Sequence, residues 1–390
     1  MVMQHVSKRK VSQEPPTQQV KSQCATVATA AASTTVRYDS MLHQHQHLQV
    51  QAMRSFGERA KWRTGTQDDL YDDDESGNAT SAPEGVRYVS VAMVGGGPAD
   101  FTSIQAAIDS VPDNNIVSTL IRILPGIYEE RVVVPPTKPF ITLEGSGINE
   151  TYVQWHLKAS DTDERGIELT AYNTASVTVY ASNFVAKDIT FKNTLPPPPP
   201  GIEGRQAAAF RMSGDMATFY RCGFVGGQDT LCDDQGRHYF EDCFIQGSID
   251  FVFGNARSLY NRCELNSIAQ SYGSVAAQDR QSLDDNTGFA FVNCKITGNG
   301  PIYLGRAMGP FSRIIFAYSQ FDDIIDPRGW DDWDHDTSKD GTVYYGQYKC
   351  DGPGANESQR VMWSHELTDE QALPFLTTSF IDGDTWLPHA

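Results

Sequence analysis

The sequence has few basic residues compared with acidic ones. Its 390 residues include 31 Lys and Arg against 49 Asp and Glu, which gives a formal charge of −18. Nucleic-acid binding needs a basic footprint, and anionic membrane surfaces attract cations, so this balance excludes both as expected partners. An acidic protein also repels a polyanionic substrate, unless the charges of that substrate are masked, for example as esters.

Long apolar runs and several well-known motifs are also absent from the sequence. No apolar stretch reaches the roughly 18 residues that a membrane-spanning helix needs, and the polar, basic residues 1–10 are followed by no apolar segment, so no signal peptide is expected. There is no G-x-S-x-G elbow and no CxxC or Cys/His metal spacing. The glycine triplet 95–97 lacks the flanking pattern of a nucleotide loop. The sequence therefore offers none of these metal or nucleotide motifs.

Residues 1–85 differ in composition from the rest of the chain. They are rich in Gln, Ser, Thr and Ala, with an acidic run at 72–75 and alternate histidines at His43, His45 and His47. These histidines could hold a metal, but no carboxylate or cysteine is placed beside them, so a low-complexity tail is favoured. Such a composition buries too little apolar surface to fold. We predict a disordered N-terminal region over 1–85 and one folded domain over 86–390.

A short repeat runs through the middle of the chain. Each copy begins with an aromatic residue, has a reference position three residues later, and has an apolar residue two residues after that. Four copies have cysteine at the reference position: Phe219–Cys222–Phe224, Phe240–Cys243–Ile245, Tyr260–Cys263–Leu265 and Phe291–Cys294–Ile296. Weaker copies are assigned to Phe184–Lys187–Ile189 and Phe316–Ser319–Phe321. Such repeats are typical of solenoids, in which each copy forms one coil. The cysteines are expected to form a ladder of small buried residues, with disulfide pairing as the alternative.

Short β-rich runs divided by Gly, Pro and Asn accompany the repeat, at 86–94, 120–124, 132–134, 141–143 and 177–179. Residues 104–111 keep helical spacing instead, with Thr102 or Ser103 as a possible N-cap, and a second helix is expected over 368–376. Strands at a fixed step with little helix predict an all-β fold, a right-handed parallel β-helix. Its first helix caps the open end, and its C-terminal tail packs back on the solenoid.

Two aspartates fall at matching points of neighbouring repeats. Asp229 lies seven residues after Cys222 and Asp250 seven residues after Cys243, so each pair is 21 residues apart. If each repeat is one coil, the two carboxylates stack on adjacent coils, whose backbones lie about 4.7–4.9 Å apart. Two carboxylates this close cannot both ionise easily at neutral pH. One is favoured as an acid and the other as a base or nucleophile.

The neighbours of Asp250 are apolar. Residues 251–253 cannot hydrate a carboxylate, so an ionised Asp250 needs a cationic or hydrogen-bonding partner. The candidate is Arg306, because a guanidinium can hold a carboxylate with two bonds. The corresponding position of the next repeat, seven residues after its cysteine, is assigned to Gln270. An acidic residue at this position is therefore not a general feature of the repeat. Aspartates that satisfy turn backbone groups are the structural alternative, favoured for either residue alone but not for the pair.

Other features of the sequence are assigned mainly structural roles. The prolines at 196–200 predict a stiff loop that forms a wall of a cleft before Gln206. His238 lies in a repeat strand and is expected to be structural. The acidic run 331–336 is interpreted as a solvated loop, with a cation site as the alternative. Trp330 and Trp333 could offer aromatic faces to a sugar, although a single tryptophan more often belongs to a core.

Five segments, in one order, resemble the plant pectin methylesterases (pectinesterases) over roughly residues 86 to 388. They are GIYEE at 126–130, QAAAF at 206–210, GQDTL at 227–231, DFVFG at 250–254 and LGR at 304–306. The family fold is a right-handed parallel β-helix, in agreement with the repeat. The resemblance implies a carboxylic ester hydrolase that removes methyl groups from C6-methyl-esterified galacturonate of pectin, releasing methanol and pectate without a cofactor or metal.

The resemblance also implies a role for each candidate catalytic residue. Asp250 is the nucleophile, and Asp229 is the general acid and then the base. Gln206 and Gln228 form the oxyanion hole, while Arg306 orients Asp250. A carboxylate nucleophile gives an anhydride-type acyl-enzyme, and two amide donors stabilise the tetrahedral anion.

Substrate contacts are expected from Trp330, Phe251 and Met308. Met308 is a departure, because the family commonly has tryptophan two residues after the arginine. Expected partners are methyl-esterified homogalacturonan and proteinaceous pectinesterase inhibitors, and the protein is expected to be a monomer outside the cell, in the cell wall. Two rival functions stay open: a β-helix glycoside hydrolase of pectin, whose retaining mechanism suits close carboxyls, and a non-catalytic protein that binds wall polysaccharide, which Met308 keeps in view.

Overall fold

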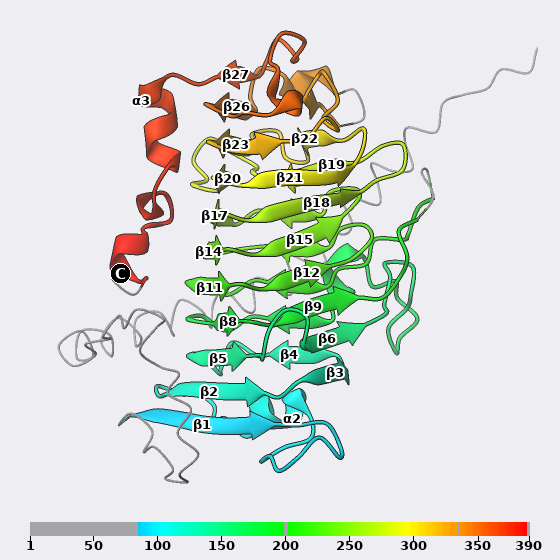
Figure 1. Cartoon of the computed structure of the whole chain (residues 1–390), viewed down its shortest axis with the longest axis vertical. Coiled ribbons are helices and arrows are strands. Elements are labelled where there is room, and N and C mark those ends of the chain that lie inside the picture. The colour runs from blue at the N-terminus through cyan, green and yellow to red at the C-terminus, as the bar shows by residue number, and fades with distance from the viewer. Residues whose placement is uncertain (1–84, 199–201, 334–335, 388–390) are drawn as a thin grey trace, which may run out of the picture. The chain divides into compact units, whose positions relative to one another are not determined.

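The computed structural model describes residues 85–198, 202–333 and 336–387, which belong to one compact unit spanning Asp74–Ala390. Within these residues the strands stack into three parallel sheets (Figure 1). The predicted all-β parallel β-helix is confirmed. The histidine tract and all of the expected N-terminal region except Gly85 lie outside the described residues, so the division at residue 85 stays a prediction.

The sheet that we call sheet A contains the residues of the repeat that precede each reference cysteine. Its strands, in spatial order, are β1 (Val86–Val91), β2 (Ser118–Ile123), β5 (Ile141–Glu144), β8 (Val185–Lys187), β11 (Ala217–Tyr220), β14 (Arg237–Glu241), β17 (Arg257–Asn261), β20 (Gly288–Val292), β23 (Arg313–Ala317), β26 (Tyr344–Tyr348) and β27 (His365–Glu366).

Each coil continues through two further sheets, B and C. Sheet B contains β3 (Gly126–Glu129), β6 (Thr151–Trp155), β9 (Thr190–Asn193), β12 (Gly223–Val225), β15 (Phe244–Gly247), β18 (Glu264–Ile268), β21 (Lys295–Asn299) and β24 (Gln320–Phe321). Sheet C contains β4 (Val132–Val134), β7 (Val177–Val179), β10 (Phe210–Met212), β13 (Leu231–Asp233), β16 (Val252–Gly254), β19 (Ser274–Gln278), β22 (Tyr303–Arg306) and β25 (Trp330–Asp331).

The aromatic position of the repeat builds the interior of the solenoid. Phe219, Phe240, Tyr260, Phe291 and Phe316 are fully buried and stack along the axis, with ring centroids 4.5, 4.4, 4.6 and 4.6 Å apart in that order. Each ring covers the next, so the apolar surface of one coil is removed from water only when its neighbours are in place. This is why the pattern recurs at each coil.

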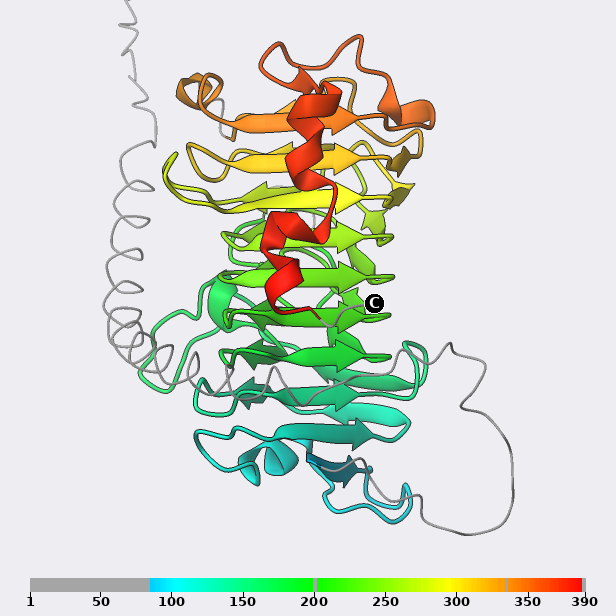
Figure 2. The ribbon, with the colours of Figure 1, turned by 90° about the vertical axis from the view of Figure 1, so that its left-hand side faces the viewer.

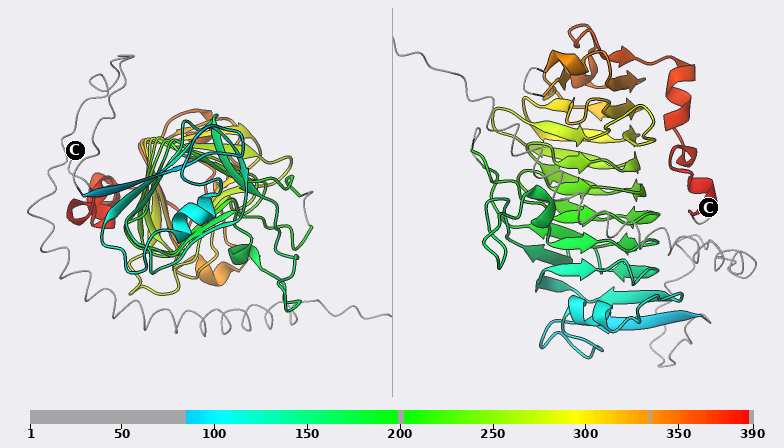
Figure 3. Two further views of the ribbon diagram at one scale, coloured as in Figure 1. Left: turned by 90° about the horizontal axis from the view of Figure 1, so that it is seen from below. Right: turned by 180° about the vertical axis from the view of Figure 1, so that it is seen from behind.

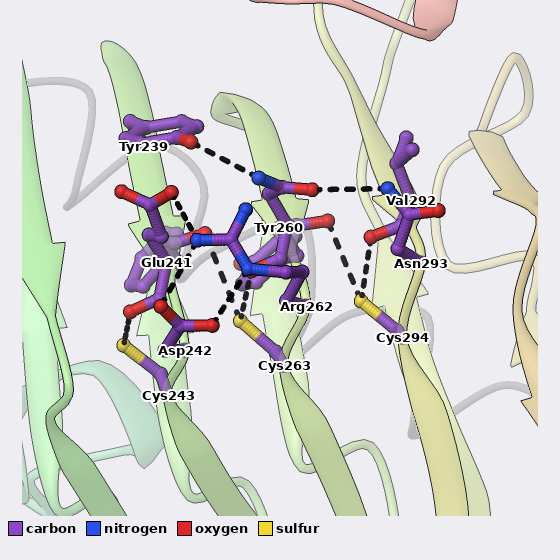
Figure 4. Close-up of polar contacts among 12 residues, drawn as sticks. Tyr239, Glu241, Asp242, Cys243, Tyr260, Arg262, Cys263, Val292, Asn293 and Cys294 are labelled. Atoms are coloured by element: carbon purple, nitrogen blue, oxygen red, sulfur yellow. Dashed lines mark hydrogen bonds and ion pairs between the residues drawn. The ribbon is translucent and has the colours of Figure 1, made fainter. Parts of the chain in front are cut away.

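The cysteine ladder is confirmed. The four reference cysteines are free thiols and at most 2% exposed. Figure 4 shows Cys243, Cys263 and Cys294 on successive coils, each with its thiol donating to a backbone carbonyl. Cys294, for example, donates to the oxygen of Tyr260 at 3.4 Å. Disulfide pairing is therefore not the role of the ladder.

One weak copy of the repeat was assigned in the wrong register. Tyr220 pairs with Lys187 and Gly223 with Thr190, so the residue opposite Cys222 is Ile189 rather than Lys187. Because side chains alternate with a period of two along a strand, a pattern of apolar residues can match equally well after a shift of two residues. The other weak copy, Phe316–Ser319–Phe321, is confirmed by its pairing with the preceding coil.

The first helix, α2 (Ile104–Asp109), covers the open N-terminal end of the coils (Figure 3). The hydroxyl of Ser103 caps it by accepting from the N–H of Ala106 at 3.2 Å, and Ile104, Ala107 and Ile108 are buried. The predicted capping helix and one of its two proposed caps are confirmed. Because the helix covers the first coil, it keeps the apolar end of the stack out of water.

The C-terminal tail runs back along the outer face of sheet A (Figure 2), as predicted. It consists of α3 (Asp369–Ala372) and the 3-10 helices η5 (Leu373–Phe375), η6 (Thr378–Ile381) and η7 (Gly383–Thr385). Pro374 has no N–H to continue α3, so the helix is shorter than the predicted 368–376. Asp382 ties the tail to Arg257 at 2.8 Å. Other short 3-10 helices are η2 (Ala171–Asn173), η3 (Thr337–Lys339) and η4 (Pro353–Ala355).

Candidate active site

On the outer face of sheet C, five successive strands each contribute one side chain to a continuous row. In register these are Arg211, Cys232, Phe253, Ala277 and Arg306. The three middle residues form a small apolar cluster that is distinct from the solenoid core. The row therefore has an apolar floor with an arginine at each end.

Asp229 and Asp250 lie beside this floor, each two residues before the start of its strand of sheet C. Gln228 bridges to Ile249 in parallel register, and the N–H of Asp229 donates to the oxygen of Ile249 at 3.0 Å. The two aspartates therefore occupy adjacent coils, which confirms the stacking that the spacing predicted. Their residues are only 8% and 4% exposed.

Both aspartates have left-handed backbone conformations, with φ of 57° for Asp229 and 49° for Asp250. Non-glycine residues seldom adopt this conformation, although aspartate tolerates it better than most. The turn re-aims the chain just before each strand of sheet C. Strained backbone of this kind is often found at functional sites.

Asp250 is held by two side chains. Arg306 donates from Nε to Oδ1 at 2.9 Å and from Nη2 to Oδ2, so the guanidinium grips both oxygens. The hydroxyl of Ser274 donates to Oδ1 and accepts from the backbone N–H of Asp250 at 3.0 Å. A carboxylate in an almost dry site needs cationic and hydrogen-bonding partners of this kind. The predicted contact with Arg306 is confirmed.

Ser274, not Gln270, is the counterpart of Asp250 in the next coil. Phe244 pairs with Glu264, 20 residues later, whereas Val252 pairs with Ala276, 24 residues later. The turn between these strands is therefore longer by four residues, and Gln270 lies exposed on it. A count from the cysteine alone misses this insertion. The apolar run of β19 was the signal that could have fixed the register.

Aromatic rings enclose the guanidinium of Arg306. Its Cζ lies 4.1 Å from the centroid of the Trp333 ring and 5.7 Å from that of Tyr272. Its Nη1 also donates to the hydroxyl of Tyr272 at 3.1 Å. Cation–π contacts and this third hydrogen bond fix the plane of the guanidinium, and with it the orientation of Asp250. Sequence reasoning did not assign Tyr272 to the site.

The environment of Asp229 differs, because none of the described cationic side chains touches it directly. Burial, and secondarily the charge of Asp250, raise the pKa of Asp229 well above its usual value, while Arg306 and a hydrogen bond from Gln228 partly oppose the shift. The protonated form is therefore favoured at higher pH than for an ordinary aspartate. One carboxyl group is thus prepared to give a proton and the other to act as an anion.

Gln206 and Gln228 lie on successive coils beside the two aspartates. The N–H of Ala207 donates to the oxygen of Gln228 at 3.1 Å, which joins the two segments. Both glutamines are half-buried, and Oε1 of Gln206 is a buried side-chain atom with no hydrogen-bond partner within the described residues. Buried polar atoms normally have a partner, so this oxygen is available to accept a hydrogen bond from a ligand.

Two of the three expected substrate contacts are corrected. Trp330 is 1% exposed and stacks on Tyr345 at 4.7 Å inside the core, because it pairs with Gly305 on the inward side of the strand. Phe251 is fully buried in the same core. The aromatic residues of the outer apolar cluster are instead Phe253, Trp333 and Tyr172.

Met308 does pack against the apolar floor, as its predicted place in the cleft requires. Trp333 packs against the same floor, so the floor keeps an aromatic ring even though position 308 has none. That Met308 contacts substrate stays a prediction.

The remaining polar candidates have local partners. His238 is fully buried, with Nε2 2.8 Å from the oxygen of Gly214 and Nδ1 against Asp233, as a structural histidine would be. In the acidic run, Asp331 accepts from the N–H of Trp333 at 2.9 Å and Asp336 caps η3. Among described residues there is no group of three potential metal ligands, and no helix there is both long and apolar enough to span a bilayer.

The sequence also matches known proteins. A family model described as Pectinesterase matches residues 89–384. The chain belongs to the pectinesterase family. It is therefore an enzyme, a carboxylic ester hydrolase, and the resemblance found in the sequence motifs is confirmed.

Relatives in sequence and a related solved structure cover most of the chain. Pectinesterase QRT1 of Arabidopsis thaliana is 48% identical over 312 residues, which cover 80% of this chain and 81% of that protein. Probable pectinesterase 8 of the same plant is 46% identical over 299 residues, covering 75% and 74%. The structure of a pectin methylesterase from carrot superposes with a TM-score of 0.72 at 31% identity, covering 80% of this chain and 99% of that one.

Proposed function

We propose that this enzyme removes the methyl groups of pectin by hydrolysing the C6 methyl ester of galacturonate, releasing methanol and pectate. The observation that carries the proposal is the unequal pair of carboxyls on adjacent coils. Asp250 is bound by Arg306 and Ser274, whereas Asp229 has a raised pKa and no direct cationic partner in the described part of the chain. Ester hydrolysis through a carboxylate nucleophile uses one group to attack and one to protonate the leaving group, and the pair supplies both.

In the first half of the reaction, Asp250 attacks the ester carbonyl carbon. The carbonyl oxygen becomes an oxyanion, to which the side-chain amides of Gln206 and Gln228 donate. Collapse of the tetrahedral intermediate breaks the bond to the methoxy oxygen, and Asp229 gives that oxygen its proton, so methanol leaves. The galacturonyl group stays on Asp250 as an anhydride. Loss of one oxyanion donor typically lowers turnover by about 10²–10³-fold.

In the second half, Asp229 is an anion and acts as the base. It takes a proton from a water molecule that attacks the anhydride carbonyl. The bond to Asp250 breaks, which restores the carboxylate that Arg306 holds and leaves a free carboxylic acid on the sugar. Asp229 is protonated again, so both groups return to their starting states without a cofactor.

The setting of this reaction is also part of the proposal. Family membership favours the cell wall, outside the cell, as its place and methyl-esterified homogalacturonan as its polymer, with proteinaceous pectinesterase inhibitors as candidate partners. We propose that the enzyme acts as a monomer. The formal charge of −18 favours polymer whose carboxyls are still esterified over polymer already rich in carboxylate.

The test is an assay of the purified full chain on highly methyl-esterified pectin, with methanol and new reducing ends measured in parallel. Methanol without new reducing ends is the expected result. Reducing ends without methanol would replace the proposal with glycoside hydrolysis. Binding to pectin with neither product would contradict catalysis. The same assay on Asp250→Asn separates the chemistry of this site from any contaminating esterase.

A further inference from the structure

A column of arginines lies on sheet A, whereas the candidate active site lies on sheet C. Arg237, Arg257 and Arg313 each occupy the first position of their strand, in β14, β17 and β23. Arg237 pairs with Arg257 in register, and Arg257 pairs with Gly288, the first residue of β20. Because the protein has a formal charge of −18, a local excess of positive charge is a feature to be explained.

The arginine column faces the C-terminal tail (Figure 2). Side chains two residues apart on a strand share a face, and the residues two positions after the arginines pack with the tail in one cluster. These are Tyr239, Leu259 and Ile315. Cζ of Arg257 lies 5.5 Å from the centroid of the Phe380 ring, and Cζ of Arg313 lies 5.7 Å from the same centroid. Two guanidinium groups therefore lie against one ring of the tail.

Glycine at position 288 makes room for the side chain of Arg313. Phe289 pairs with Ile314, so Gly288 stands opposite Arg313 and between the strands of Arg257 and Arg313. A Cβ added to Gly288 would lie 2.7 Å from Nε of Arg313, closer than real contacts allow. The side chain of Arg313 thus lies over the backbone of Gly288, on the side of its strand that faces Arg257.

Two carboxylates contact the first two arginines of the column. Asp215 accepts from Nε of Arg237 at 3.0 Å and from Nη2 at 2.6 Å. Asp382 of the tail accepts from Nη1 of Arg257 at 2.8 Å and lies 3.4 Å from Nη1 of Arg237. Nε of Arg257 is a buried atom with no hydrogen-bond partner within the described residues. Arg257 therefore has a donor available to a further acceptor.

Arg313 has only neutral partners within the described residues. Its Nε donates to the oxygen of Thr287 at 2.9 Å, and its Nη2 donates to Oδ1 of Asn286 at 3.3 Å. Burial, and then the charges of Arg280 and Arg257, lower the pKa of Arg313 to about 10. A positive charge at Arg313 is therefore unfavourable as it stands, and an anion beside it would be stabilised.

Arg280 adds charge to the group without needing another ligand. Its Nε and Nη2 donate to the backbone oxygens of Asp285 and Leu283, both at 2.7 Å. The carboxylate of Asp285 does not neutralise it directly, because that group accepts from the N–H groups of Gln281 and Ser282. In the described part of the chain, four arginines and the two aspartates that contact them thus leave two positive charges.

The arginine column is open to solvent at its edge. Asn286, which bonds to Arg313, is exposed, and the side chain of Asp382 is 46% exposed. A small ion can therefore reach Arg313 from the side of the tail without displacing a strand. A larger apolar molecule would gain little there, because the rings of the tail already cover the guanidinium groups.

We propose that Arg257 and Arg313 bind a small tetrahedral oxyanion, phosphate or sulfate, between sheet A and the C-terminal tail. A guanidinium presents parallel N–H groups that match the oxygens of such an ion. A dianion also matches the two positive charges that remain. The bound ion joins strands β17 and β23 beneath Phe380, so it holds the tail against the sheet. A free phosphate ion and a phosphate ester offer the same chemistry to the site.

The test is the binding of inorganic phosphate and of sulfate to the full chain, measured by isothermal titration calorimetry in a chloride buffer near neutral pH. We expect a saturable site with a dissociation constant on the order of 1 mM. Arg313→Gln should weaken binding at least about tenfold, because a charged donor is lost. Arg313→Lys keeps the charge without the planar fork and should bind with intermediate affinity.

Arg122→Gln is the matched control. Arg122 also lies on sheet A, but its Nη2 pairs with Oε2 of Glu144 at 3.1 Å, and phosphate binding should be unchanged. At constant ionic strength, about 10 mM phosphate should raise the melting temperature of the parent and of this control by about 2–4 °C more than that of Arg313→Gln. The comparison between variants removes the general stabilisation that these anions give to most proteins.

Two further readouts identify the ligand and locate the site. Tighter binding of glycerol 2-phosphate than of inorganic phosphate would assign the site to a phosphate ester, and the reverse order would assign it to the free ion. Hydrogen exchange in residues 373–385 should slow when the parent binds phosphate, because the tail is held more firmly. This readout needs no variant, so it decides the matter even if Arg313→Gln does not fold.

Three results would overturn the inference. They are the absence of saturable phosphate or sulfate binding to the parent, equal binding to the parent and a folded Arg313→Gln variant, and binding that leaves hydrogen exchange of the tail unchanged. None of these measurements depends on methanol release, so a failure of the proposed function would leave the test of the anion site intact.

Discussion

Asp233 and Asp250 are both buried aspartates next to sheet C, but they lie on opposite faces of it. Inside the solenoid, Asp233 is fully buried, contacts Nδ1 of His238 through Oδ1 and accepts from the hydroxyl of Tyr260 at 2.6 Å through Oδ2. His238 in turn uses its other nitrogen on a backbone carbonyl. Every member of this interior network has a protein partner, so nothing is left for a ligand.

On the outer face, by contrast, the network is incomplete. Asp250 has Arg306 and Ser274, but Asp229 beside it has no direct cation, and Oε1 of Gln206 has no partner among the described residues. Both sites contain hydrogen-bonded carboxylates, and only one of them leaves polar groups unsatisfied. This difference, rather than burial or a shifted pKa alone, separates a functional group of residues from a structural one.

Asp250→Asn should give the largest effect, on turnover. An amide cannot attack the ester, so methanol release should fall by about 10⁴-fold or more. Turnover should be measured on methyl-esterified pectin, with circular dichroism as a check on folding. Asn is nearly isosteric but leaves Arg306 without its anion, so a moderate loss of stability is compatible with the assignment. Near-normal turnover in the variant would show that Asp250 is not the nucleophile.

Asp233→Ala should lower the stability of the protein and leave its turnover per folded molecule nearly unchanged. Removal of one partner from a buried charged network costs about 3–5 kcal/mol, because His238 and Tyr260 are left without an acceptor. Urea unfolding at equilibrium would measure this loss. At low temperature, where the variant stays folded, turnover per folded molecule should remain close to that of the parent. A folded variant that is stable but inactive would contradict the division between the two faces.

Asp229→Asn should reveal a pH-dependent difference in stability. The pKa of Asp229 is raised in the folded state by burial and by Asp250, so the folded state binds more protons than the unfolded chain above the ordinary aspartate pKa of about 3.9. The free energy of unfolding contributed by this group therefore falls as pH rises from that value through the raised pKa. The Asn variant lacks this penalty.

Thermal unfolding of the parent and Asp229→Asn across a pH series would measure the effect. The melting temperatures should be similar at pH 4, and the variant should become relatively more stable towards neutral pH. Its methanol release should be lost at every pH, since it has no proton to give. A constant difference in melting temperature across the series would mean that the carboxyl group is not protonated in the folded enzyme.

The sequence predicted the repeat, the fold class and the neighbouring positions of Asp229 and Asp250, because each depends on a regular step between coils. It also predicted the contact with Arg306, since a carboxylate in apolar surroundings needs a cation. The predictions were wrong where the number of residues in a coil changes, or where a side chain faces the core rather than the outer surface of a strand. Because of the four extra residues before β19, Gln270 was assigned the position that Ser274 occupies. Trp330 lies on the inward side of its strand and therefore does not face the cleft.

Arg262→Ala should have the smallest effect, a small loss in the free energy of unfolding. It tests whether the contribution of a bidentate ion pair to stability is set by its geometry or by its burial. Arg262 donates to both oxygens of Asp242, at 2.9 and 3.0 Å, and also contacts Glu241 (Figure 4). The pattern resembles that of Arg306 on Asp250, but the side chains of Arg262 and Asp242 are 49% and 46% exposed against 14% and 6% in the buried pair.

Water competes for exposed charges, so the loss in free energy of unfolding for Arg262→Ala should be at most about 1 kcal/mol. Most of that loss should disappear in about 1 M salt, where the screening length is only about 3 Å. Arg262 has a left-handed φ of 55°, and alanine keeps the Cβ, so the backbone strain of the turn is the same in both proteins and the difference reports on the ion pair. A salt-independent loss of several kcal/mol would mean that the charged turn between sheets A and B supports the stack as strongly as the interior network does.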